Sequence, residues 1–343
     1  MTTQQDVQVG FGKESTYGTA VTVDHFFETT DEGFDWNPTF AQGAGLRVGR
    51  IVNAADRRVL VKEESDGSID IELFQKGLGF LFLGALGAGT STVVSGSAFQ
   101  QVITPATSDF LPSYTVQVGL PPLGGGALNP QTYSGMLCDT FAMKAASGSI
   151  PTIKFTYKGK SKSTATALAT PSYPAGNGLY TFVQGSLQVG GALTLPTTTA
   201  LASMTSPTLT GADVREFDLN WNNNLDANGF NLNTAGTLSR SKAVGLRAGT
   251  GTMTVEYDAN VWRDAFLNQT DLSLVLTFQS TVPITGAVFP TFQVVIPDLR
   301  LNGGMPQPNK GEVITTSVGF EVLDNRSASS ALYIVIVTPE TAF

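Results

Sequence analysis

The chain of 343 residues contains a single cysteine, Cys138, and a single histidine, His25. One cysteine excludes an intramolecular disulfide and a cysteine-rich zinc cluster. A cysteine nucleophile needs a base beside it, and His25 is far away in the sequence, so a Cys–His pair is not expected. The alternating context MLCDTF instead predicts that Cys138 is a small buried residue on a strand.

Charge is also scarce. Charged residues make up 14% of the chain, against about 25% in a typical soluble domain. The formal net charge is −8, which argues against nonspecific binding to DNA or to an anionic membrane, since both require clustered Lys and Arg. A lightly charged chain rich in Thr, Ser, Gly and Asn indicates a surface that neighbouring molecules largely cover.

Long hydrophobic runs are missing. The most apolar segment, Leu73 to Gly89, is shorter than the roughly 20 residues of a membrane-spanning helix, and Lys76 and several glycines interrupt it. Its composition is shared with membrane-fusion peptides, but a short buried helix is the preferred interpretation. Residues 1–20 contain no apolar stretch, so no secretory signal is expected.

Catalytic and ligand-binding motifs are absent. The stretch QVGFGKESTYGTAV resembles a phosphate-binding loop, but Val7 stands where the first Gly is needed and Glu14 where Ser or Thr would hold magnesium. The segment NNNLDANGFNL has one acid, Asp226, and no Glu at the twelfth position of a calcium loop. The acidic residues within 31–35 and 63–66 lie in turn-rich segments, where solvated charge is usual. The sequence therefore predicts no catalytic residues, no cofactor, no metal and no enzyme activity.

What the chain does contain is a series of short β-branched and aromatic runs separated by Gly, Pro, Asn and Asp, which predicts a mainly β fold. Helix patterns are restricted to the run at 73–89 and to residues 258–269, which Asp258 could cap. The expected strands are 114–120, 152–160, 215–221, 252–258, 272–280, 291–297, 313–323 and 332–338.

An internal repeat follows from these elements. The stretch from Gly67 matches the stretch from Gly251, at an offset of 184 residues (251 − 67), and in both a strand leads into a short amphipathic helix. The segment 161–178 has the composition of a linker. We therefore expect a tandem duplication, with domains at 1–165 and 166–343. Each would be a β-sandwich or half-barrel unit with one short flanking α-helix.

Each half also carries a long loop with apolar residues near its tip. Loops of this length are commonly functional, and exposed apolar tips indicate contact with another chain. The candidate contact residues are Leu46, Val48, Ile51, Leu225, Phe230 and Leu232.

Several motifs, in this order, resemble one known family. They are the opening GFGKESTYGTAVTVDHFF with ETTDEGFDW, the strand-then-helix element GSIDIELFQKGLGFLFLGALG, the hairpin YSGMLCDTFAMKAASGSIPTIKFTYKGK, and REFDLNWNNNL. Together they cover most of the chain. They resemble the major tail tube protein of bacteriophages with long, flexible, non-contractile tails, the siphovirus type.

The resemblance implies that subunits form a ring whose inner sheets join into a β-barrel, and that rings stack into a hollow tube for genome ejection. With two units per chain, trimeric rings are favoured over hexameric ones. The tape measure protein would occupy the lumen, and tail terminator and distal tail proteins the ends. Double-stranded DNA would pass through without specific binding, and no membrane is involved. Assembly would take place in the host cytoplasm.

The resemblance also assigns residues. The N-terminal arm would contact neighbouring subunits through Phe11, Lys13, Glu14 and Tyr17. The acidic candidates for the lumen are Asp70, Glu72, Glu256 and Asp258. Shortening 41–50 or 222–231 is expected to leave the monomer folded and to prevent tube growth. The alternatives are another phage structural module (a capsid decoration or baseplate component), a β-rich glycan hydrolase, and a bacterial surface protein.

Overall fold

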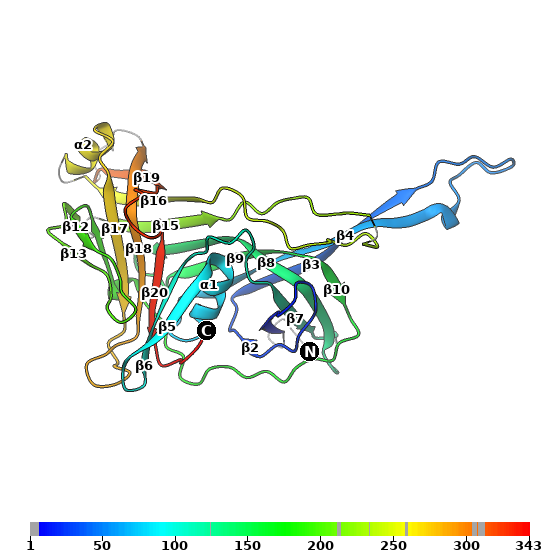
Figure 1. The fold of residues 1–343 in the computed structure, drawn as a ribbon, viewed down its shortest axis with the longest axis horizontal. Helices are drawn as coiled ribbons and strands as arrows, with labels where there is room; N and C mark the ends of the chain where they lie inside the picture. The colour runs from blue at the N-terminus through cyan, green and yellow to red at the C-terminus, as the bar shows by residue number, and fades with distance from the viewer. Residues whose placement is uncertain are drawn as a thin grey trace.

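A computed structural model describes residues 7–123, 125–210, 214–232, 234–257, 260–303, 307 and 313–343. Within them the chain is mostly β-strand, as predicted, and a large antiparallel sheet system contains most of the strands (Figure 1). In the first half the strands and helices are β1 Gln8–Lys13, β2 His25–Phe26, β3 Asp31–Gln42, the 3₁₀ turn η2 Ala55–Arg57, β4 Arg58–Glu72, α1 Leu78–Leu86, β5 Gly87–Ser95, β6 Ala98–Pro105, β7 Tyr114–Leu120, β8 Asn129–Ala146, β9 Thr152–Gly159 and β10 Ser161–Ser163.

The second half repeats this mixture of strands and one short helix. Its elements are η3 Phe182–Gln184, β11 Gly185–Val189, β12 Ala192–Thr194, β13 Ser203–Thr205, β14 Leu209–Thr210, β15 Val214–Asn222, β16 Ala248–Glu256, α2 Val261–Leu267, β17 Leu272–Gln279, β18 Thr291–Gly303, β19 Thr315–Val322 and β20 Tyr333–Thr338. The strands predicted from the sequence coincide with β7, β9 and β15–β20 to within a few residues.

One layer of the molecule is a sheet that crosses both halves. Its strand order is β3–β4–β9–β8 followed by β15–β16–β19–β18, and the two groups join where β8 pairs with β15. We call it the joined sheet. Its inner face carries alternating large apolar residues, such as Ile69, Phe155, Phe141, Phe217 and Phe320, all of them buried.

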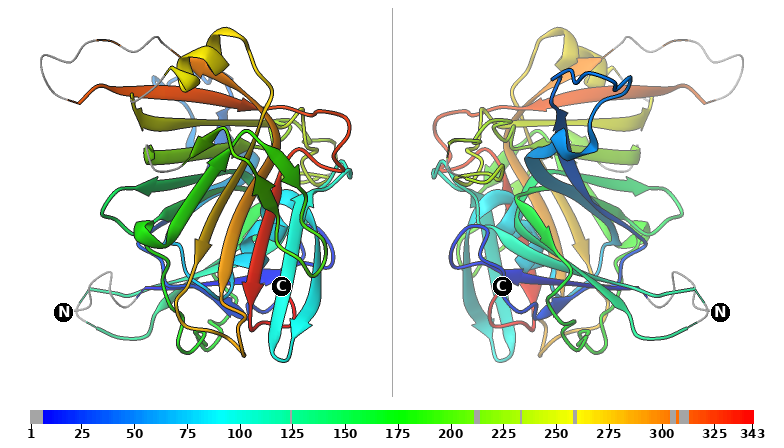
Figure 2. Two further views of the ribbon diagram at one scale, coloured as in Figure 1. Left: turned by 90° about the vertical axis from the view of Figure 1, so that its left-hand side faces the viewer. Right: turned by 90° about the vertical axis from the view of Figure 1, so that its right-hand side faces the viewer.

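The second layer covers the apolar face of the joined sheet. It contains β1–β7–β8 in the first half and β11–β17–β18–β20–β6–β5 in the second. The long strands β8 and β18 belong to both layers, since each changes pairing partners along its length. In the left view of Figure 2, β17, β18 and β20 cross in front of β15, β16 and β19.

The helix α1 lies inside this sandwich, against β6, β8, β5 and β20. Every residue of α1 is buried, which confirms the short buried helix expected in this run, whereas the amphipathic pattern expected from the repeat is absent. A helix that is apolar all round is buried all round, and the sequence LGFLFLGAL has no polar face to expose. The helix α2 does lie at the surface, with Trp262 buried and Leu267 exposed. The predicted cap Asp258 lies outside the described residues, and Asn260 precedes the first turn.

The two halves pair their strands in the same order. The first half runs β1–β7–β8–β9–β4–β3, and the second runs β11–β17–β18–β19–β16–β15. Along the chain these elements also follow one another in the same sequence, with α1 and α2 in the same place. The hairpin β5–β6 after α1 has no counterpart after α2, because β17 begins only a few residues later.

Candidate assembly surfaces

The strands β3 and β4 form a long hairpin that projects away from the body of the molecule (Figure 1). The segment 41–50, expected as a loop, contributes the last residues of β3 and part of the hairpin tip. Leu46, Val48 and Ile51 are fully exposed, and Val52 is largely exposed. A cluster of apolar side chains without contacts is unusual on a monomeric protein and is typical of a surface that binds another chain.

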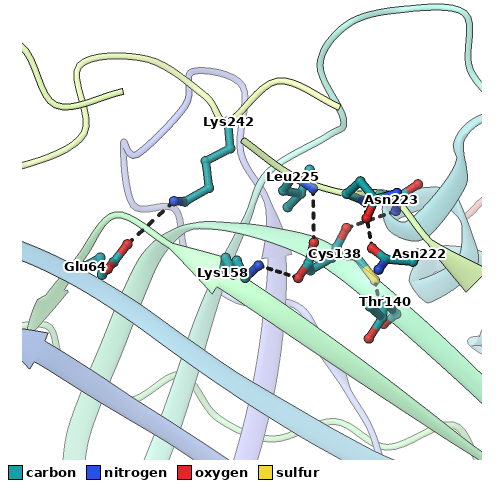
Figure 3. A network of polar contacts seen from close by, with 10 residues as sticks. Glu64, Cys138, Thr140, Lys158, Asn222, Asn223, Leu225 and Lys242 are labelled. Carbon is teal, nitrogen blue, oxygen red and sulfur yellow. Dashed lines mark hydrogen bonds and ion pairs between the residues drawn. The ribbon is translucent and has the colours of Figure 1, made fainter. Parts of the chain in front are cut away.

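The long loop of the second half is different, because residues 223–232 and 234–247 fold back over the first half. Asn223 is completely buried, and its side-chain amide donates to the carbonyl oxygens of Ala85 at 2.8 Å and Cys138 at 3.0 Å. Leu225 is buried, and its backbone N–H donates to the Asp139 carboxylate at 3.2 Å (Figure 3). Lys158 pairs with the same carboxylate at 2.6 Å.

Further along this loop, a buried lysine holds it against the hairpin. The side chain of Lys242 is 2% exposed, and its ammonium lies 3.5 Å from the Glu64 carboxylate (Figure 3). Partial burial raises the pKa of Glu64, but the hydrogen bond from Lys62 and the charges of Lys242 and Lys62 outweigh it, so the pKa lies below its ordinary value. Phe230 is half-buried under the Lys62 ammonium, and Leu232 is exposed.

The N-terminal arm is anchored within its own chain. The strand β1 pairs with β7 and β2, and Phe11 is fully buried against Phe27 and Tyr114. Glu14 is 7% exposed and accepts four hydrogen bonds. Its donors are the backbone N–H groups of Gly18 and Gly135 and the hydroxyls of Ser113 and Thr115, at 2.7 to 3.0 Å. Lys13 is exposed, and Tyr17 is half-buried beside Lys160.

The outer face of the joined sheet is polar and acidic. Residues in register across the strands share a face, which places Asp70, Lys154, Asn220, Thr250 and Glu321 in one row. We call this surface the polar sheet face. Its acidic residues are Asp31, Asp35, Asp66, Asp70, Glu72, Glu216, Asp218, Glu256 and Glu321, and the basic residues on or beside it include Lys144, Lys154, Lys158, Arg215 and Arg300.

Two of the acids predicted for the lumen are paired on this face. Asp70 lies 2.8 Å from Lys154, and Glu256 lies 2.5 Å from Arg215. Glu72 is half-buried, and Asp258 lies outside the described residues. The acids Glu216, Asp218 and Glu321 were not singled out from the sequence. Their alternation with apolar residues along the strands indicates that each points away from the core, but only the strand register shows that they share a face.

The groups capable of chemistry are dispersed. Cys138 is fully buried, and burial raises the pKa of its thiol. His25 stacks on Phe80, with ring centroids 3.9 Å apart. Within the described residues no cluster of His, Cys, Asp and Glu could hold a metal ion. No helix in that part of the chain combines the length and the apolar character needed to cross a membrane.

A mostly β chain with open sheet edges and a projecting apolar hairpin has the features of a structural protein that assembles with other chains. Comparison with protein families is in agreement. The family model described as phage tail tube protein matches residues 4–322. The chain therefore belongs to the phage tail tube family, whose members self-assemble into the tube of the virion tail. A comparison with curated proteins found no match.

Proposed function

We propose that copies of this chain form rings that stack into the hollow tube of a long, flexible, non-contractile tail, through which the genome is ejected. The role is structural rather than catalytic. The observation that carries the proposal is the joined sheet, which is apolar and covered on one face. Among the described residues its other face is polar and uncovered, and its edges are open. Closing such a sheet into a barrel removes its edges and encloses the polar face.

The common pairing order of the two halves supports a tandem duplication, with units at 1–165 and 166–343. On this basis three chains supply six units to a ring, and trimeric rings are preferred. A ring of six chains is the alternative. Each ring needs a contact that closes, and the tube needs a second contact between rings.

The polar sheet face is proposed to line the lumen. Phosphate contacts by Lys and Arg would hold DNA through counterion release, whereas an acidic lining repels it. The excess of acids on this face, including Asp70, Glu72 and Glu256, fits passage of double-stranded DNA without specific binding.

The hairpin tip is proposed to contact the next ring, because Leu46, Val48 and Ile51 are fully exposed in the part of the chain that the structure describes. Leu232 is the exposed candidate in the second loop, whereas Leu225 and Phe230 already pack against the first half. In the arm, Lys13 and Tyr17 remain the proposed contacts between subunits. Phe11 and Glu14 would support them from inside the chain.

The proposed partners beyond the chain itself follow from a place in the tail tube. They are the tape measure protein in the lumen and the terminator and distal tail proteins at the two ends. Assembly would occur in the host cytoplasm. Contact with a membrane is not proposed.

Electron microscopy of the purified chain tests this function. We expect uniform hollow tubes. End-on averages should show six units with three-fold symmetry for rings of three chains, or six-fold symmetry for rings of six chains. A capsid decoration or baseplate component would not polymerise alone into a uniform tube. A chain that stays monomeric at every concentration would contradict the proposal.

A further inference from the structure

An open groove lies where the N-terminal arm meets the segment that leads into β3. Its volume is about 460 Å³, and its lining includes Val9, Phe27, Glu28, Glu32 and Tyr173. We call it the acidic groove. We propose that it receives the hairpin tip, residues 43–58, of a second copy of this chain. The inference rests on the proposed function and names the surface on which the tip docks.

The acidic groove combines an apolar floor with a charged and aromatic rim. Val9 and Phe27 are almost fully buried, whereas Glu28 is exposed and Tyr173 keeps 43% of its surface exposed. Burial raises the pKa of Tyr173, and the charge of Glu28 raises it further, because the carboxylate lies close to the phenol. No lysine or arginine is among the described residues that line the groove.

This chemistry is suited to arginine side chains. A guanidinium group donates paired hydrogen bonds to a carboxylate and also stacks on the face of an aromatic ring. The carboxylates of Glu28 and Glu32 and the ring of Tyr173 offer both kinds of contact in one groove. The floor can cover apolar side chains that accompany the arginines.

The hairpin tip is the basic segment of an acidic chain. It contains Arg47, Arg50, Arg57 and Arg58 against a single acid, Asp56, so its formal charge is +3 (4 − 1). The rest of the chain therefore carries −11 (−8 − 3). Such a difference in charge favours contact between the tip of one copy and an acidic surface of another.

Two of these arginines lie in the same turn. The backbone N–H of Arg50 donates to the carbonyl oxygen of Arg47 at 3.1 Å, and both residues are exposed. Neither side chain forms an ion pair with another described residue. The exposed Leu46, Val48 and Ile51 lie beside them. The tip thus presents two cations and an apolar surface, and the groove presents two carboxylates and an apolar floor.

The groove and the tip of one chain lie at opposite ends of β3. The strand begins at Asp31, beside the groove, and runs through Gln42 into the projecting hairpin (Figure 1). Twelve residues of strand span about 35–40 Å, so a tip does not reach the groove of its own chain. A copy displaced along β3 can bring its tip to the groove. Each copy then offers a tip to one neighbour and a groove to another, which is the open, head-to-tail contact that extends a stack.

A second open groove, of about 450 Å³, is a less suitable receptor. It lies beside β12 and the loop that follows β19, and its lining includes Asp271 and Asp298. The Asp271 carboxylate is already paired with Arg300 at 2.7 Å. Part of the negative charge of this groove is therefore neutralised within the chain.

Reversing charge on each surface in turn tests the contact. Glu28→Arg with Glu32→Arg, and separately Arg47→Glu with Arg50→Glu, would place like charges together. Each pair should raise the concentration needed for tube growth by at least about tenfold, measured by sedimentation. The chain with all four substitutions should form tubes again near the wild-type concentration, because both surfaces then have reversed charge.

The matched control is Asp271→Arg, which reverses an exposed acid in the second groove. It should assemble like the wild type. The melting temperature of each unassembled variant shows whether its fold is kept.

A measurement on the unaltered groove does not depend on the folding of the groove variants. A photoreactive benzophenone side chain is placed at Val48, and the tubes are irradiated and digested. Mass spectrometry should find links from residue 48 to peptides that contain residues 27–32 or Tyr173 of another copy. The same side chain at Leu123, an exposed leucine outside the hairpin, should give no such links.

The outcomes separate this inference from the proposed function. Wild-type tubes with links from residue 48 only to other surfaces, including the second groove, would overturn the acidic groove as receptor and leave the tube intact. Four substitutions that fold but do not restore tubes would also count against the pairing of these charges. A wild-type chain that never assembles would contradict the proposed function, and the docking with it.

Discussion

At the scale of single residues, Glu14 shows how a buried charge can determine the path of a segment. Its carboxylate accepts hydrogen bonds from two backbone N–H groups and two hydroxyls, and three of these four hydrogen bonds are buried. Leaving a buried donor unsatisfied costs about 1–3 kcal/mol. We expect Glu14→Ala to lower the free energy of unfolding by ~2–4 kcal/mol, measured by urea denaturation.

The control for this substitution is Lys13→Ala, one residue away and exposed. Its effect should stay within about 0.5 kcal/mol, as for most surface changes. Equal stability of the two variants would show that the Glu14 network does not hold the arm.

Glu64 gives a second prediction, on pH. Its pKa is lower in the folded chain than its ordinary value of 4.5. Between the folded and the unfolded pKa of Glu64, the unfolded chain binds more protons than the folded one, so the free energy of unfolding rises with pH. The contribution of the Glu64 carboxylate to the free energy of unfolding is complete above the unfolded pKa, and it is lost as the pH falls through the folded pKa. The difference in unfolding free energy between the wild type and Glu64→Gln should be constant above about pH 5.5 and shrink on acidification below it.

Chemical denaturation at a series of pH values measures this difference. The wild type, but not Glu64→Gln, should lose this part of its stability between about pH 5 and the folded pKa. Parallel curves for the two proteins would show that folding does not lower the pKa of Glu64.

At the scale of elements, the sequence predicted what side-chain periodicity determines and missed what depends on distant contacts. The strand 114–120 was predicted with its observed limits, because YTVQVGL is β-branched and bounded by turn residues. The long hairpin β3–β4 was not foreseen. Its outer part is exposed on both faces, so no apolar alternation marks it.

The long loop of the second half also depends on distant contacts that the sequence could not predict. It was expected to project like the first, since Leu225 and Phe230 resemble exposed contact residues. Instead Asn223 and Leu225 are buried by partners in β8 and α1, more than 80 residues away in the chain. Removing 222–231 would therefore damage the fold itself, and only the hairpin tip can be altered without such damage.

This contrast defines a prediction for the hairpin tip. The triple variant Leu46→Ser, Val48→Ser, Ile51→Ser removes apolar surface that no described residue covers. We expect the melting temperature of the unassembled chain to be unchanged and tube growth to be lost or to require a much higher concentration. Electron microscopy and sedimentation measure the second effect.

Leu123→Ser is the matched control, because Leu123 is also an exposed leucine in a loop between two strands. It should assemble like the wild type. Normal tubes from the triple variant would rule out the hairpin tip as the contact between rings.

At the scale of the whole molecule, the structure shows where many of the acidic residues lie. A net charge of −8 does not show where the acids lie, but strand register places nine of them on the polar sheet face. In the proposed tube this face would repeat in every copy, so a small charge per chain would become a continuous lining. A substitution of two residues per chain would likewise be repeated in every copy of the tube.

Reversing charge on this face is therefore expected to act on DNA passage rather than on folding. Glu72→Lys with Asp218→Lys places new cations in every ring at half-buried positions that are accessible from the polar side. DNA phosphates would exchange their counterions for these lysines, so ejection from virions carrying the variant should slow, most strongly at low salt. Asp324→Lys, on an exposed loop between β19 and β20, adds a lysine away from the face and should leave ejection unchanged. Time-resolved measurement of released DNA at two salt concentrations checks the expected rates for the double variant and for the control. Equal rates for all three proteins would show that the polar sheet face does not meet the genome.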